Sequence, residues 1–193
     1  MFRFLLPAII AIGIAFGLGA WSADQVTNDF RGFSTIKLDG WTAQLQNGGG
    51  DTDPYLRASI ARSGELALGD AEGLRFTRLL DDDEDRLHGA CDYQITDLDT
   101  DARAWALSAI ASRSDADVRS RKTIVTSGTA IAFDNAPWMV LLSSSLKPGV
   151  WASPPAENEF DLELILIDTS IGTSLGISTP SLPSVTKLGC RDG

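Results

Sequence analysis

The first pattern along the chain is an uncharged, mostly apolar run over residues 4–21, which follows Arg3 and precedes a polar stretch. A helix rises about 1.5 Å per residue, so roughly twenty apolar residues cross the hydrocarbon core of a bilayer. The run therefore predicts a transmembrane helix in contact with lipid. It is longer than the apolar core of a secretory signal, about 7–15 residues, which favours a retained anchor. Cleavage after Ser22 is the alternative.

Small residues and charges add to this prediction. Gly13 and Gly17 form a G-x-x-x-G pattern, which lets helix backbones approach closely in lipid. The pattern predicts packing against a membrane-protein partner or a second copy, although glycine is also frequent in such segments without this role. Arg3 lies before the run and the next cation is Arg31. By the positive-inside rule we expect a cytoplasmic N-terminus and an exported C-terminal domain.

The polarity pattern divides the whole chain into three parts. We expect residues 1–23 to form the anchor and residues 24–50 a polar juxtamembrane linker, with a possible first strand at 41–45. Residues 51–193 then form one folded domain, long enough to bury a core of its own.

One helix is well signalled near the start of this domain, over residues 53–63. Asp53 suits the N-cap, Pro54 suits the first turn, and Gly64 suits the position after the last turn.

Beyond the helix the period changes to the alternation of strands. The segment 159–168 is the clearest case, since Phe160, Leu162 and Leu164 share one face and acids occupy the other. Further strands are predicted at 74–79, 90–96, 103–111, 122–126, 129–134 and 138–144, with the acidic run 81–85 as a turn and 170–184 as an extended loop. Short strands between turns, with one short α-helix, indicate an all-β fold: an antiparallel β-sandwich or jelly roll.

The net charge of −10 narrows the range of partners. A chain without a basic stripe cannot release counterions from phosphates, so we expect no nucleic-acid partner. The same charge opposes electrostatic docking of the domain on anionic lipid.

The two cysteines, Cys91 and Cys190, fit neither a metal site nor a C-x-x-C redox motif. In an oxidising compartment they would form one disulfide; two buried free thiols are the alternative.

The acidic run offers a candidate for calcium. Asp81, Asp83 and Asp85 alternate, and hard oxygen ligands suit this ion. However, an EF-hand loop needs glycine where Arg86 stands and glutamate where Asp92 stands. A solvated hairpin turn is the favoured interpretation, and we assign neither a metal nor a cofactor.

A nucleophile is also hard to assign. Residues 172–176 spell G-x-S-x-G, but that motif requires a later histidine, and the single histidine, His88, lies upstream. We expect His88 in a turn or at the surface, and assign no catalytic residue.

Five aromatic residues could line a ligand groove: Trp41, Tyr55, Trp105, Trp138 and Trp151. Trp105 and Trp138 lie within apolar strands, which indicates core packing. Trp151 stands in a proline-rich loop, so it and Tyr55 are the candidate ligand or partner contacts.

The order of motifs resembles a known family. The sequence elements are Asp53-Pro-Tyr-Leu-Arg, Glu72-Gly-Leu-Arg-Phe, Leu87-His-Gly, Cys91-Asp-Tyr-Gln-Ile, Ala102-Arg-Ala-Trp-Ala-Leu, Pro148-Gly-Val-Trp, Phe160–Ile167 and Leu182-Pro-Ser-Val. Together they resemble the exported bacterial "domain of unknown function 1214" family in a short, membrane-anchored form. The resemblance implies a jelly-roll-like domain, often joined in longer proteins to a second uncharacterised domain, and no established reaction. Glu84 stands where the family commonly has glycine, and Val150 replaces the usual asparagine.

Because the family that the chain resembles is bacterial and exported, we expect a single-pass protein of the bacterial inner membrane with a periplasmic C-terminal domain. These observations support a non-catalytic binding or accessory subunit of an envelope assembly. The alternative is a hydrolase or glycan-modifying enzyme, which would need two carboxylates about 5–10 Å apart across a groove. A carrier with an apolar cavity between the sheets is a further possibility.

Overall fold

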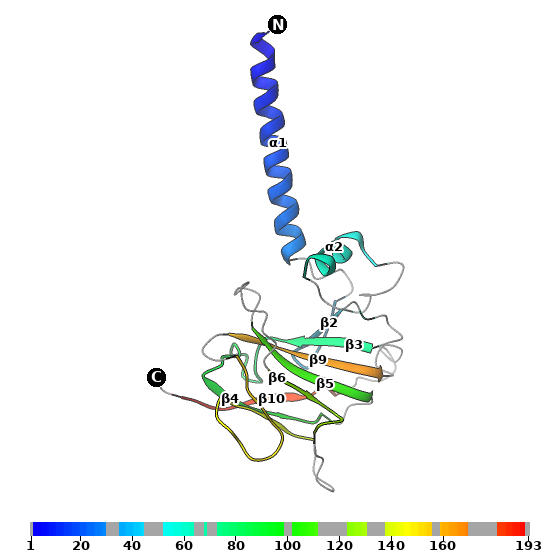
Figure 1. The fold of residues 1–193 in the computed structure, drawn as a ribbon, viewed down its shortest axis with the longest axis vertical. Coiled ribbons are helices and arrows are strands. Elements are labelled where there is room, and N and C mark those ends of the chain that lie inside the picture. The colour runs from blue at the N-terminus through cyan, green and yellow to red at the C-terminus, as the bar shows by residue number, and fades with distance from the viewer. Residues whose placement is uncertain are drawn as a thin grey trace.

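The computed structural model describes residues 2–29, 35–44, 52–63, 68, 73–98, 102–111, 123–130, 138–155, 159–169 and 181–191. Figure 1 shows a long N-terminal helix, α1, that projects from a β-rich domain. This helix covers Phe2–Asp29. Its stretch Leu6–Gln25 is long and apolar enough to cross a membrane, as the sequence predicted, and none of it is buried inside the protein.

The β domain consists of two sheets, which confirms the all-β prediction. The first is six-stranded, in the order β1 (Thr35–Leu38), β2 (Trp41–Gln44), β3 (Gly73–Arg78), β9 (Phe160–Thr169), β5 (Ala102–Ala111), β6 (Thr123–Thr126). The second is four-stranded, in the order β10 (Ser184–Cys190), β4 (Cys91–Thr96), β7 (Val140–Leu142), β8 (Trp151–Ala152). The described pairings are antiparallel except that β7 and β8 run parallel.

The core lies between the sheets. Phe160, Leu162 and Leu164 of β9 are fully buried, as their alternation predicted, because β9 lies in the middle of its sheet between β3 and β5. From the other sheet, Tyr93 meets Phe160 edge-to-face with the ring centroids 5.9 Å apart. Burying a large apolar side chain contributes roughly 1.5–3 kcal/mol, so this layer accounts for much of the stability.

Most predicted strands are present within a few residues of their expected bounds. The strand predicted at 129–134 is not found in its described part, since residues 129 and 130 form part of a turn; residues 131–134 lie outside the described residues. Strands β1, β8 and β10 were not predicted. β1 and β8 are short, and β10 is an edge strand whose Leu188 is 56% exposed, so its apolar alternation is broken.

The predicted helix is α2, Pro54–Ser63. Asp53 caps it, since its Oδ1 accepts the main-chain N–H groups of Tyr55 (2.8 Å) and Leu56 (3.3 Å). Leu56 is buried. In Figure 1, α2 lies beside the C-terminal end of α1, with which it is in contact, on the side of the domain nearest the long helix.

Candidate functional site

The acidic turn at residues 81–85 is organised by one buried carboxylate. Asp81 Oδ1 accepts the main-chain N–H groups of Asp83 at 3.0 Å and Asp85 at 2.9 Å. Lys187 of β10 forms ion pairs with the Asp81 and Asp85 carboxylates. In the part of the chain that the structure describes, no three acids, histidines or cysteines are grouped so that they could hold a metal ion. Of the carboxylates singled out for calcium, that of Asp81 therefore organises the turn, and those of Asp81 and Asp85 pair with Lys187.

Glu84 completes this turn in a conformation that glycine adopts most easily. Its φ is 66°, in the left-handed region. Glycine adopts this geometry at less cost than a residue with a side chain.

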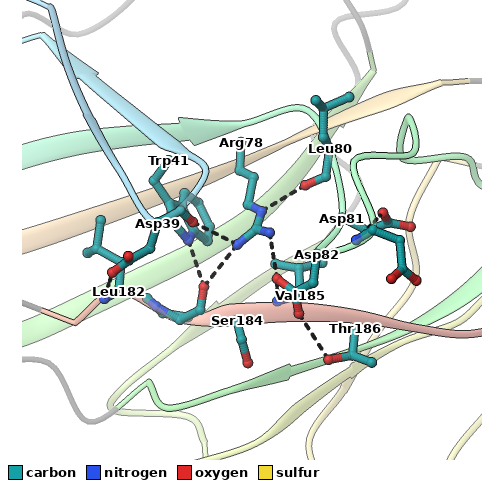
Figure 2. Close-up of polar contacts among 12 residues, drawn as sticks. Asp39, Trp41, Arg78, Leu80, Asp81, Asp82, Leu182, Ser184, Val185 and Thr186 are labelled. Carbon is teal, nitrogen blue, oxygen red and sulfur yellow. Dashed lines mark hydrogen bonds and ion pairs between the residues drawn. The ribbon is translucent and has the colours of Figure 1, made fainter.

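The turn is joined to the sheet by Arg78, the last residue of β3, which is 4% exposed. Its Nε donates to the carbonyl oxygen of Leu80 at 2.7 Å, and its Nη1 donates to those of Asp39 at 3.1 Å and Pro183 at 3.3 Å. Its Nη2 donates to Asp82 Oδ1 at 2.6 Å. Figure 2 shows these contacts converging on one guanidinium. One side chain thus links four chain segments.

An aromatic side chain packs beside the guanidinium. Trp41 is fully buried, with its ring centroid 5.9 Å from Arg78 Cζ, within the range of a cation–π contact. Its Nε1 donates to the carbonyl oxygen of Pro183 at 2.7 Å. Gly40 has a φ of 78°, and a Cβ added there would lie 3.1 Å from Arg78 Cζ. The sharp β1–β2 turn is thus shaped around the arginine.

Asp82 extends the same set of contacts to the edge strand β10. Its N–H donates to the carbonyl oxygen of Val185 at 2.9 Å, while its Oδ1 accepts the Val185 N–H at 3.1 Å. Its Oδ2 accepts the Thr186 hydroxyl at 3.0 Å. Burial alone would raise the pKa of the Asp82 carboxyl; the hydrogen bonds from Val185, Arg78 and Thr186 and the charge of Arg78 outweigh this and lower it. The turn therefore pairs main-chain groups that an edge strand would leave open.

We call Asp39, Trp41, Arg78, Asp82, Pro183 and Val185 the Arg78 cluster. Its contacts are internal to the fold, and its main effect is to join β1, β2, β3 and β10. The sequence analysis did not single out Arg78. A signal was present, because Arg78 continues the inward alternation of Leu74 and Phe76 in the predicted strand.

The acids of the clearest strand lie on its outer face and are paired with arginines. Arg86 Nη2 lies 2.5 Å from Asp161 Oδ1, and its Nε lies 3.1 Å from Glu159 Oε2. Burial acts to lower the pKa of Arg86, but these two carboxylates raise it overall. Glu163, also buried, lies 3.7 Å from Arg75. The neighbouring carboxylates of this face are thus paired with arginine side chains.

The aromatic candidates separate into buried and exposed residues. Trp105 is 5% exposed and meets the half-buried Trp138 edge-to-face at 5.7 Å, so both pack in the core as predicted. Trp151 is half-buried, and its Nε1 donates to the carbonyl oxygen of Ser143 at 2.9 Å. Tyr55 is 55% exposed on α2. The structure brings Trp151 and Tyr55 to different elements, β8 and α2.

The remaining candidates are placed as follows. His88 lies before a turn, where its Nδ1 accepts the N–H of Ala90 at 3.2 Å. The G-x-S-x-G sequence at 172–176 lies outside the described residues. Cys91 and Cys190 form the predicted disulfide, which joins paired positions of β4 and β10.

No protein-family model matches this chain, and no curated protein matches its sequence. Among solved structures it is similar to the VPA0106 protein from Vibrio parahaemolyticus, at 14% identity with a TM-score of 0.52, over 72% of this chain and 36% of that chain. An uncharacterised protein from Burkholderia cenocepacia aligns at 10% identity with a TM-score of 0.45, over 65% of this chain and 32% of that chain. The Vibrio match shows a shared fold, and this chain spans about a third of that protein's length.

Proposed function

We propose that this protein is a single-pass protein of the bacterial inner membrane, with its N-terminus in the cytoplasm and its β domain in the periplasm. There it acts as a non-catalytic binding or accessory subunit of an envelope assembly. We also propose that it is a short, membrane-anchored form of the domain of unknown function 1214 family, which is consistent with the left-handed φ of Glu84.

The observation that carries this proposal is the exposure of α1. In a water-soluble domain, an apolar helix would pack its apolar side chains against the core of the domain. In Leu6–Gln25 no part is buried, and Phe16, for example, is 77% exposed. Twenty residues of helix extend about 30 Å, which matches the hydrocarbon core of a bilayer. Lipid is the environment that suits such a surface.

Two features of the β domain support the remaining parts of the proposal. The disulfide between Cys91 and Cys190 suits an oxidising compartment such as the periplasm. The principal polar clusters in the described residues, the Arg78 cluster and the arginine-paired acids of β9, use their charges to hold strands together. This arrangement favours a binding or accessory role over acid–base chemistry.

The location is tested in the cells that express the full chain. A retained anchor would keep the protein in the membrane after alkaline extraction. The mass of the intact protein would then show that residues 1–22 are still present. Protease added to spheroplasts should digest the β domain from outside. A soluble periplasmic product lacking residues 1–22, or a domain protected in spheroplasts, would contradict the proposal.

The partner is tested on the small-residue face of α1. A Cβ added at Gly13 or Gly17 meets nothing within 4 Å in the protein, so Gly13→Leu with Gly17→Leu alters only a surface available to another helix. We expect this double variant to lose a crosslinked oligomer or partner that the unaltered chain forms in mild detergent. Gly19→Leu is the matched control, since Gly19 is equally open but lies on another side of the helix. A monomer in all three proteins, or equal loss in the control, would contradict a G-x-x-x-G interface.

A further inference from the structure

We propose that α2 is a membrane-contacting helix, whose exposed face, with Tyr55, lies against the lipid headgroups of the bilayer that α1 spans. This inference rests on the proposed anchoring by α1 and adds a second contact between the protein and the membrane. It assigns a role to α2, which is the short helix among the described residues of a domain otherwise built of strands.

The position of α2 along α1 is the first argument. Between residues 6 and 25, Asp24 is half-buried and every other side chain is exposed, so within this stretch the domain covers the long helix at Asp24. α2 contacts α1 and lies beside its C-terminal end in Figure 1. Asp24 is also close to the end of the candidate span at Gln25. The two helices therefore meet at the level where the chain leaves the hydrocarbon core.

The dimensions of the bilayer then place α2 in the headgroup layer. A bilayer of about 40–45 Å has a hydrocarbon core of about 30 Å, so each polar layer is roughly 5–7.5 Å deep. From Gln25 to the end of α1 at Asp29 the helix rises about 6 Å at 1.5 Å per residue. A helix about 10 Å across that packs beside this last turn must overlap the polar layer.

The composition of α2 suits that position. Its sequence, PYLRASIARS, contains Arg57 and Arg62 and no acid, in a chain with 26 acids and a net charge of −10. The preceding acid, Asp53, is engaged as the N-cap. The domain as a whole is repelled by anionic lipid, but the charged side chains within α2 are both arginines, which phosphate headgroups attract; the nearest acids in the sequence, Asp51, Asp53 and Glu65, lie outside the helix.

The exposed face of α2 carries a residue typical of membrane interfaces. Leu56 and Ile60 lie on the inner side of the helix, buried and half-buried respectively. Tyr55 and Ala58 lie on the outer side, both exposed, and Tyr55 is 55% exposed. Tyrosine is enriched at the boundary between lipid and water, where its ring meets apolar chains and its hydroxyl meets water. Trp21, 64% exposed on α1, is a second aromatic side chain near the same boundary.

The experiment places a photoreactive residue at single positions of the full chain in nanodiscs of phosphatidylcholine and phosphatidylglycerol. Tyr55→benzoylphenylalanine tests α2, and Trp21→benzoylphenylalanine tests the anchor. The matched controls are Leu146 and Leu188, which are 83% and 56% exposed and belong to the four-stranded sheet and its loop. Because all four side chains are exposed, the substitutions should leave the fold unchanged. Lipid adducts are identified by mass spectrometry after illumination.

We expect phospholipid adducts when the photoreactive residue is at position 55 or 21. We expect none when it replaces Leu146 or Leu188. Adducts at Trp21 without adducts at Tyr55 would overturn this inference and leave the anchor intact. An absence of adducts at Trp21 would overturn the anchor itself and, with it, this inference. Equal lipid labelling at Tyr55 and at the two control positions would also overturn it, because the contact would then not belong to α2.

Discussion

Replacing Arg78 with methionine should destabilise the β domain strongly. Methionine retains an unbranched apolar stem but removes the guanidinium that joins the β1–β2 turn, the acidic turn and β10. The change leaves the Asp82 carboxylate without its cation and removes the donor from three main-chain carbonyls.

The magnitude follows from the burial of the two partners. Breaking a fully buried ion pair by removing one partner costs about 3–5 kcal/mol. Here the Arg78 side chain is 5% exposed but that of Asp82 is 37% exposed, so water can solvate the remaining charge in part. This places the ionic contribution near the lower end, at about 3 kcal/mol. Each lost hydrogen bond to a carbonyl adds about 1 kcal/mol or less. We therefore expect a loss of roughly 3–5 kcal/mol in the free energy of unfolding.

The measurement is guanidinium unfolding of the full chain in detergent, followed by tryptophan fluorescence, since Trp41 lies within the cluster. The matched control is Arg103→Met. Arg103 lies 3.7 Å from Asp168, but both side chains are largely exposed, at 77% and 69%, so about 0–1 kcal/mol is expected.

Two results would refute this reasoning. The first is a loss below about 1 kcal/mol for Arg78→Met, which would equal that of a surface pair. The second concerns Arg78→Lys, which remains measurable if the methionine variant does not fold. Lysine retains the charge but not the planar fork of donors. The stability of the Arg78→Lys variant should therefore fall between those of the original chain and the Arg78→Met variant. A lysine variant as stable as the original chain would show that the fork geometry is unimportant.

Three further predictions concern the same domain. The pKa of the Asp82 carboxyl is lowered because its hydrogen bonds and the adjacent guanidinium outweigh burial, so its stabilising effect is present above the ordinary value of 3.8 and is lost as pH falls through the folded value. Asp82→Asn should therefore flatten the acid limb of a stability–pH curve, and an unchanged limb would contradict this. A Cβ at Gly73 would lie 2.5 Å from a main-chain oxygen of β9, so Gly73→Ala should cost about 1–3 kcal/mol by thermal unfolding. Gly189→Ala, with open space around it, should have an effect within about 0.5 kcal/mol, and equal effects would refute the steric argument. Reducing the Cys91–Cys190 bond, which spans 99 residues, should lower the free energy of unfolding by roughly 4–5 kcal/mol, and identical denaturation curves with and without reductant would count against it.

Local features of the sequence predicted the elements whose signals are local. Residues 4–21 are apolar without interruption, so a helix of membrane length could be read from them directly. Asp53 and Pro54 marked the start of α2, because capping depends on a few neighbouring residues. Strand β9 could be predicted because apolar and acidic residues alternate from Phe160 to Leu164, which is the period of a strand.

Features that depend on distant pairing could not be predicted in this way. β10 was not predicted, since its outer edge is exposed and its pattern is weak. Pairing with β4 and the hydrogen bonds of Val185 to Asp82 make it a strand, over separations of about a hundred residues. The same holds for the acidic run. The sequence favoured a hairpin turn here over a calcium site, but it did not predict that Asp81 organises the turn or that Asp82 covers an edge.

The sequence by itself determined the apolar helix, the short helix that follows it, the all-β character of the domain and the two cysteines available for a disulfide. These follow from period, length and composition, which are properties of a continuous segment. Only the tertiary structure decided that Arg78 is the residue on which four segments converge, that the acids of β9 are paired with arginines, and that α2 lies beside the end of α1. Each of these depends on which charges and surfaces come together in space, because the free energy of a buried ion or an exposed face is set by its neighbours and not by its position in the chain.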